Sequence, residues 1–174
     1  MFIRYYVEVS HQSENVPEAL LRRPNEWLAG AAQDSLRSGR ALSAAVGLNL
    51  GHHRVERRVD VQLGPPMALG HATVVPVQWR DRAHPSLFPR LEADLEIAAM
   101  GAHRTQLAIN VRYEPPLGII GAVADRALMH RVAEATIKDF TDQVATRLHE
   151  LIVMRAHWVK LQAAPAASLS GALI

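Results

Sequence analysis

The sequence predicts an α+β fold, in which a curved antiparallel sheet of about six strands wraps around one long C-terminal helix, with two short helices. About half a dozen short segments alternate between apolar and polar residues, as strands with one buried face do. Short turns join them, which favours antiparallel pairing. The turn Tyr113-Glu114-Pro115-Pro116-Leu117-Gly118 then precedes about thirty residues with helical periodicity. This order leaves room for an apolar guest between the sheet and the helix.

The first part of the chain predicts one strand and two short helices. Residues Phe2–Ser10 alternate with a period of two, as a half-buried strand does. The segments Asn15–Leu21 and Asn25–Leu36 have helical spacing. Asn25 suits the N-cap of the second helix, and Gly39 is a plausible stop signal after it.

The middle of the chain predicts the remaining strands. Its apolar residues recur with a period of two, and Gly, Pro and His-containing turns separate the segments. The predicted strands are Ala41–Leu50, Arg54–Leu63, Leu69–Arg80, Arg90–Ala98 and Thr105–Tyr113.

The last two predicted strands carry complementary polar faces. Acidic residues occupy every second position of the first, and amide and basic residues recur in the second. Opposite charges facing each other across an antiparallel pair stabilise it by ~0.2–1 kcal/mol each. We therefore expect three acidic side chains to face three polar ones: Glu92, Asp94 and Glu96 against Gln106, Asn110 and Arg112.

The segment Asp125–Leu151 predicts the long helix. Its apolar residues recur at intervals of three and four, which gives the helix one face to bury. The composition turns to Ala, Ser, Pro and Gly near the end of the chain. We expect one domain over residues 1–160 and a disordered tail over residues 161–174.

Composition excludes several classes of function. Apolar residues make up 49% and charged residues 21% of the 174 residues, and the formal net charge is +2. The densest basic cluster, Arg54, Arg57 and Arg58, is interrupted by Glu56, so no nucleic-acid partner is expected. The absence of cysteine excludes disulfides and thiol catalysis. No stretch approaches the ~20 apolar residues of a membrane span, and no secretory signal opens the chain. A cytoplasmic protein without stable membrane insertion is expected.

No motif indicates a metal or cofactor. The adjacent His52 and His53 lie in a predicted turn, which suits one ligand at most. The sequence contains no HExxH motif, no Gly-x-Ser-x-Gly elbow and no phosphate-binding glycine loop followed by Lys-Ser/Thr. We expect no metal site and no cofactor.

Three motifs resemble the START-like superfamily, the group of polyketide cyclases/dehydrases and lipid-transport proteins also called SRPBCC. They are the turn at residues 113–118, the pair Asp125-Arg126, and His130-Arg131-Val132-Ala133-Glu134-Ala135-Thr136 leading to Asp139-Phe140. The element order is similar too. The resemblance implies a helix-grip fold, in which the sheet grips the last helix around an apolar cavity. The first loop and second helix follow the pattern only loosely.

Strand alternation and this resemblance together predict a binding site between the sheet and the long helix. Arg57 and His71 share the parity of inward-facing valines and would act as polar anchors, with Trp79 helping to orient the guest. The alternative for Arg57 is that it lies at an edge position, or that the register of the strand is shifted by one residue, so that its side chain does not point inward. Apolar lining is expected from Val59, Val61, Val75, Leu95, Leu107, Ile109, Val132, Thr136 and Phe140.

Three functions follow as hypotheses. The first is binding or transport of a small hydrophobic or amphipathic ligand, such as a lipid or a polyketide-like compound. The second is a cyclase or dehydratase that uses His71 or Asp139 as general base and Arg57 to stabilise an oxyanion. The third is a structural or partner-binding role without a ligand. The sequence leaves the ligand, the catalysis and the oligomeric state open.

Overall fold

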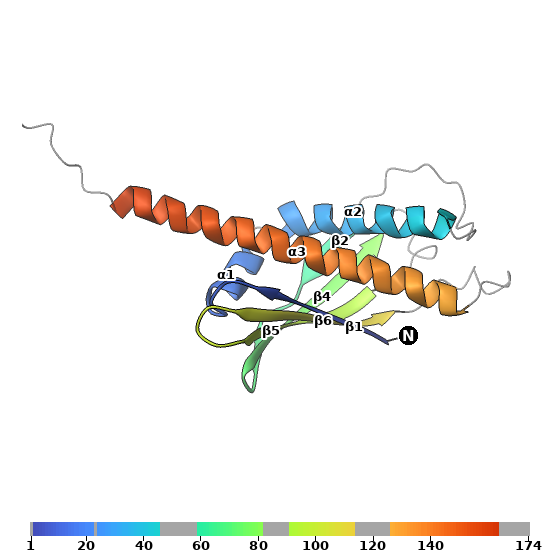
Figure 1. The fold of residues 1–174 in the computed structure, drawn as a ribbon, viewed down its shortest axis with the longest axis horizontal. Helices are drawn as coiled ribbons and strands as arrows, with labels where there is room; N and C mark the ends of the chain where they lie inside the picture. Colours follow the sequence, from blue (N-terminus) through green and yellow to red (C-terminus); the bar gives the residue numbers. More distant parts are fainter. Residues whose placement is uncertain (1, 23, 46–58, 82–90, 114–125, 164–174) are drawn as a thin grey trace, which may run out of the picture.

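Two helices cover one face of a six-stranded antiparallel sheet (Figure 1), which confirms the predicted α+β helix-grip architecture. The computed structural model describes residues 2–22, 24–45, 59–81, 91–113 and 126–163. The elements are β1 (Phe2–Val9), α1 (Asn15–Leu21), α2 (Pro24–Ala45), β2 (Val59–Leu63), β3 (Met67–Leu69), β4 (Ala72–Asp81), β5 (Leu91–Ala99), β6 (Thr105–Tyr113) and α3 (Arg126–Ala163).

The strands are ordered β1-β6-β5-β4-β2, and β3 pairs with β4 beside β2. Two of the three expected cross-strand pairs of β5 and β6 are in register, since Glu92 lies opposite Arg112 and Asp94 opposite Asn110. Glu96 instead lies opposite Ala108, and its carboxylate is 3.8 Å from the guanidinium of Arg4 on β1. Polar contacts on this face of the sheet therefore connect three strands, β5, β6 and β1.

The edge of the sheet is broken at Pro76. This residue in the middle of β4 has no N–H to donate, so it suits the point where β2 ends and β3 has not begun. The Gly64 N–H donates to the Pro76 carbonyl over 2.8 Å. A Cβ at Gly64 would lie 3.0 Å from two ring carbons of Pro76, so the close approach requires glycine.

The core lies between the sheet and the apolar faces of the three helices. On α3 the buried side chains recur at intervals of three and four, as the sequence predicts. They pack with inward-facing residues of the sheet and with Leu20 of α1 and Leu28 of α2. The α3 side chains in this cluster are Ala133, Ile137, Phe140, Val144, Ala145 and Leu148.

Helix α2 is longer than expected and corrects one predicted strand. It runs without interruption from Pro24 to Ala45, through Gly39. The predicted strand Ala41–Leu50 is therefore wrong over residues 41–45, and residues 46–50 lie outside the described part. The alternation there was misleading because alanine and leucine are strong helix formers, and one glycine costs a helix only about 1 kcal/mol.

Two other boundaries differ from the prediction. The predicted strand Leu69–Arg80 is confirmed over residues 72–80 by β4, but its first residues form a turn, since Gly70 adopts a φ of 62° and turns the chain between β3 and β4. Helix α3 continues twelve residues beyond Leu151 and ends at Ala163. The expected tail at residues 161–174 thus begins inside the helix. Residues 164–174 lie outside the described part, as do residues 54–58 of the predicted second strand.

A polar cluster fixes α3 against β1. The Tyr5 hydroxyl donates to one oxygen of Asp142 over 3.0 Å, and the Lys138 ammonium donates to the other over 2.6 Å. The same ammonium lies 5.2 Å from the centre of the Tyr5 ring. The hydrogen bond to Asp142, and then that to Tyr5, raises the pKa of Lys138 above its usual value. These contacts set the position of the helix along the edge strand.

The close approach at Gly64 predicts opposite effects for two glycine substitutions. Gly64→Ala forces a Cβ against the rigid Pro76 ring, so we expect it to destabilise the protein by about 1–3 kcal/mol. Gly30→Ala on α2 has no atom within 4 Å of the new Cβ, so we expect a gain of about 0.5–1 kcal/mol. Urea unfolding measures both, and equal midpoints would contradict the account of the sheet edge.

Candidate functional site

Side chains fill the part of the predicted sheet–helix cavity that six of the expected residues were to line. Six of the expected lining residues are buried in the core, with 0–4% of their surface exposed. A side chain beside a ligand-sized void would retain surface that a water-sized sphere can reach, and these residues retain almost none. They point inward as expected, but they pack on one another and on the helices: Val61, Val75, Leu95, Leu107, Ile109 and Phe140.

The two expected lining residues nearer the N-terminus of α3 are less completely covered. Val132 is half-buried and Thr136 is 9% exposed, whereas Ile137, Phe140 and Leu148 are at most 2% exposed. The Thr136 hydroxyl donates to the Val132 carbonyl over 2.9 Å, which satisfies it within the helix. Of the expected lining residues on α3, Val132 alone is thus only half-buried, while Thr136 and Phe140 are buried.

The expected polar anchors are not brought together in the described part of the chain. His71 is exposed in the turn between β3 and β4, because the predicted strand turns back at Gly70. This corrects the expectation that it points into the interior. Arg57 lies outside the described residues, as do the side chains of Val59 and Trp79, whose backbones belong to β2 and β4.

Asp139, the other proposed general base, belongs to a structural contact between helices. It accepts a hydrogen bond of 2.9 Å from the Gln143 amide, and the same nitrogen lies 3.1 Å from the buried Ser35 hydroxyl of α2. Within the described ranges, no hydrogen bond or ion pair joins Asp139 to His71. The geometry of these residues thus does not favour the cyclase or dehydratase hypothesis.

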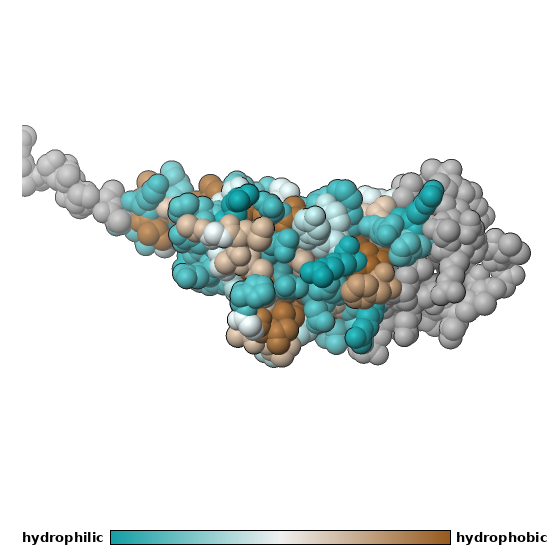
Figure 2. Space-filling model, turned by 60° about the horizontal axis from the view of Figure 1, so that its bottom comes forward, coloured by the Kyte–Doolittle hydropathy of each residue, from teal (hydrophilic) through white to brown (hydrophobic). Residues whose placement is uncertain are grey.

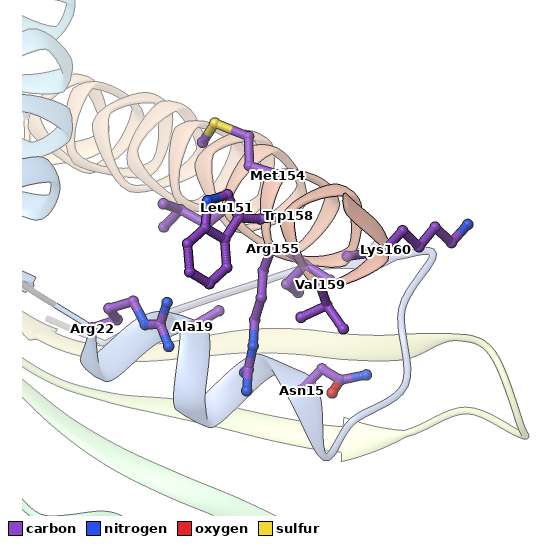
Figure 3. Close-up of a pocket in the computed structure, with 11 residues that line it drawn as sticks. Asn15, Ala19, Arg22, Leu151, Met154, Arg155, Trp158, Val159 and Lys160 are labelled. Atoms are coloured by element: carbon purple, nitrogen blue, oxygen red, sulfur yellow. The ribbon is translucent and has the colours of Figure 1, made fainter. Parts of the chain in front are cut away.

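A groove lies between α1 and the end of α3, where the sequence predicted no site. Its volume is about 660 Å3, within the range of small-molecule pockets. In Figure 3 the Arg155 side chain extends from α3 toward α1, with Trp158 and Val159 beside it. The lining residues of this α1–α3 groove are Asn15, Ala19, Arg22, Leu151, Ile152, Met154, Arg155, Ala156, Trp158, Val159 and Lys160.

The groove carries excess positive charge. Arg22, Arg155 and Lys160 line it, and the lining contains no carboxylate. Glu18, just outside it, forms an ion pair with Arg155 and lies 3.6 Å from Arg22. The hydrogen bond from Arg155 holds the pKa of Glu18 below its usual value. The Glu18 carboxylate is therefore shared by the guanidinium groups of Arg22 and Arg155.

A histidine pair joins the loop before α1 to α3. His11 Nε2 and His149 Nδ1 are 2.9 Å apart, so one of the two nitrogens carries the shared proton. The Thr105 hydroxyl donates to the His11 carbonyl over 2.7 Å and holds this loop on β6. Burial, and then the neighbouring His149, lowers the pKa of His11 from its usual value. The contact requires that the two rings are not both protonated.

Within the described ranges, no group of three or more His, Asp or Glu side chains is arranged to hold a metal ion. None of the described helices combines the length and the apolar character needed to span a membrane.

The α1–α3 groove was missed because the helix was predicted to end at Leu151. Its strongest sequence signal is the apolar spacing Met154, Trp158 and Leu161, at i, i+4 and i+7, which continues the helical pattern. The basic residues Arg155 and Lys160 interleave with it.

No protein-family profile and no curated protein matches the sequence. Solved structures do match. A conserved protein from Geobacillus kaustophilus is 14% identical, with 86% of this chain and 96% of that chain covered and a TM-score of 0.43. The Zhui aromatase/cyclase from Streptomyces sp. R1128 is 12% identical, with 86% of this chain and 94% of that chain covered and a TM-score of 0.41. Norcoclaurine synthase from Thalictrum flavum is 10% identical, with 86% of this chain and 87% of that chain covered and a TM-score of 0.39.

These likenesses are too distant to carry an argument about activity. The assignment of the fold rests on the element order, the sheet register and the burial of α3. Together they define an α+β helix-grip domain, the arrangement that the START-like resemblance implies.

The histidine pair predicts a loss of stability in acid. Because the folded protein holds the pKa of His11 below the usual 6.5, the unfolded chain binds more protons near that pH. The contribution of the His11–His149 contact to the free energy of unfolding is therefore fully present above about pH 6.5. It is lost as the pH falls through the lowered pKa of His11. Urea unfolding at pH 7.5 and at pH 5 measures it, and His11→Gln should flatten this part of the profile. An unchanged profile in the variant would contradict the assignment.

Proposed function

We propose that the protein binds a small hydrophobic or amphipathic molecule between the sheet and the N-terminal half of α3. The observation that carries this proposal is that Val132, near the start of α3, is only half-buried, whereas the stripe that begins at Ile137 is buried against the sheet. From Ile137 onward the helix is sealed onto the sheet, so a guest cannot lie there without displacing the core. At Val132 the described residues leave the helix only partly covered.

The chemistry of this region suits an apolar guest. The buried residues of the adjoining sheet and helix are apolar, and the Thr136 hydroxyl is already bonded to the Val132 carbonyl. A guest would gain about 25 cal/mol for each Å2 of apolar surface removed from water. In this proposal Val59 and Trp79 contribute from β2 and β4, and Arg57 anchors a polar head. The lipid or polyketide-like identity of the ligand belongs to the same proposal.

A neutral fluorescent probe, N-phenyl-1-naphthylamine, tests the sheet–helix site. We expect the full chain to bind it, and Val132→Trp to weaken binding about tenfold, or roughly 1.4 kcal/mol, because the indole occupies the guest's space. Thr146→Trp on the exposed side of the same helix is the matched control and should leave the affinity unchanged.

Thermal unfolding of both variants shows that the fold is retained. Absence of probe binding to the wild-type chain would overturn the proposal. So would equal affinities of the wild type and the Val132→Trp variant, since the probe would then bind elsewhere.

A further inference from the structure

The end of α3 leaves large apolar side chains in contact with solvent. Beyond Leu151 the helix runs past the sheet (Figure 1), and hydrophobic side chains lie among hydrophilic ones over this projecting end (Figure 2). Trp158 is 61% exposed, Met154 58% and Val159 53%. All three line the α1–α3 groove, so their apolar surface is gathered along one hollow.

Cations border this apolar surface from both helices. Arg22 comes from α1, and Arg155 and Lys160 come from α3. Glu18 pairs with the two arginines, while Lys160 has no ion-pair partner in the described part of the chain. Three positive charges against one carboxylate favour a guest with a negative group.

The charge distribution argues against a second copy of this chain as the occupant. Residues 151–163 contain Arg155 and Lys160 and no acidic residue. Two such helix ends packed on each other would bring like charges together and leave them unpaired. A flat bilayer also fits poorly, because Met154, Trp158 and Val159 line a hollow between two helices.

We infer that the α1–α3 groove binds a single-chain amphiphile with an anionic head, such as an aliphatic carboxylate. The alkyl chain lies along Trp158, Met154 and Val159 and removes their exposed surface from water. The head lies at the cationic rim beside Arg22, whose guanidinium donates charge-assisted hydrogen bonds to it, while Lys160 at the opposite end of the groove adds to the positive field (Figure 3). This site is separate from the sheet–helix site and does not depend on it.

Isothermal titration calorimetry of the full chain with laurate, kept below its micelle-forming concentration, tests the inference. We expect laurate to bind and dodecyltrimethylammonium, which has the same chain length and a cationic head, to bind about tenfold more weakly or worse. The double variant Arg22→Gln/Lys160→Gln should weaken laurate binding about tenfold or more. Trp158→Ala should also weaken laurate binding, because it removes apolar surface that the alkyl chain covers.

Matched variants separate the two sites. Arg147→Gln removes an exposed arginine of α3 that pairs with Glu150 outside the groove, and it should leave laurate affinity unchanged. Laurate is itself amphipathic and suits the sheet–helix site as well, so the titration is repeated in the Val132→Trp background, where Arg22→Gln/Lys160→Gln should still weaken laurate binding about tenfold. Lys160→Gln should not affect binding of the neutral probe. Circular dichroism and thermal unfolding show that each variant is folded.

Three results would overturn the inference. They are the absence of laurate binding to the wild type, an affinity for the cationic amphiphile equal to that for laurate, and a laurate affinity that the double variant does not change. Binding to vesicles of anionic phospholipid without binding of monomeric laurate would also overturn it, because the groove would then belong to a membrane-docking surface.

Discussion

The fold depends on the packing of one apolar stripe of α3 onto the inner face of the sheet. Ile137, Phe140, Val144 and Leu148 form this stripe, and each is at most 2% exposed. A fully buried Leu or Phe contributes about 1.5–3 kcal/mol relative to an exposed one, so these four contacts are a large share of a typical net stability. The polar contacts of Tyr5 and Lys138 with Asp142 then fix where along the edge strand the stripe lies.

This constraint also divides the molecule into regions that can and cannot hold a guest. Where the stripe is buried, the sheet and the helix share a filled core. Val132 is only half-buried, and beyond Ile152 the exposed end of the helix lies across the α1–α3 groove from α1. The two proposed sites lie at these two ends of α3, one more enclosed and apolar, the other open and cationic.

Most of the fold could be predicted from the sequence because a period of two and a period of 3.6 are strong signals when one face is buried. Val9, Leu107 and Phe140 point inward as their spacing predicts. The prediction failed where the composition was ambiguous. The alanine-rich residues 41–45 fit either period, and the end of α3 leads into a segment rich in Ala, Ser, Pro and Gly that is typical of a disordered tail.

The candidate sites were much less predictable. Alternation predicts the direction of a side chain but not whether the space before it is empty, and Leu107 and Ile109 point inward into a filled core. His71 had the right parity but lies beyond the last paired residue of its strand, where parity no longer decides exposure. The groove is formed by α1 and the end of α3, which are about 130 residues apart in sequence, so no local pattern could reveal it.

The proposed binding site beside the filled core is tested most directly by methyl NMR of the full chain titrated with the neutral probe. We predict chemical-shift changes for the methyl groups of Val132 and Thr136, with little change at Leu107 and Ile109. Changes centred on Leu107 and Ile109 would mean that the core opens to admit the guest. That result, or the absence of any change, would contradict the account.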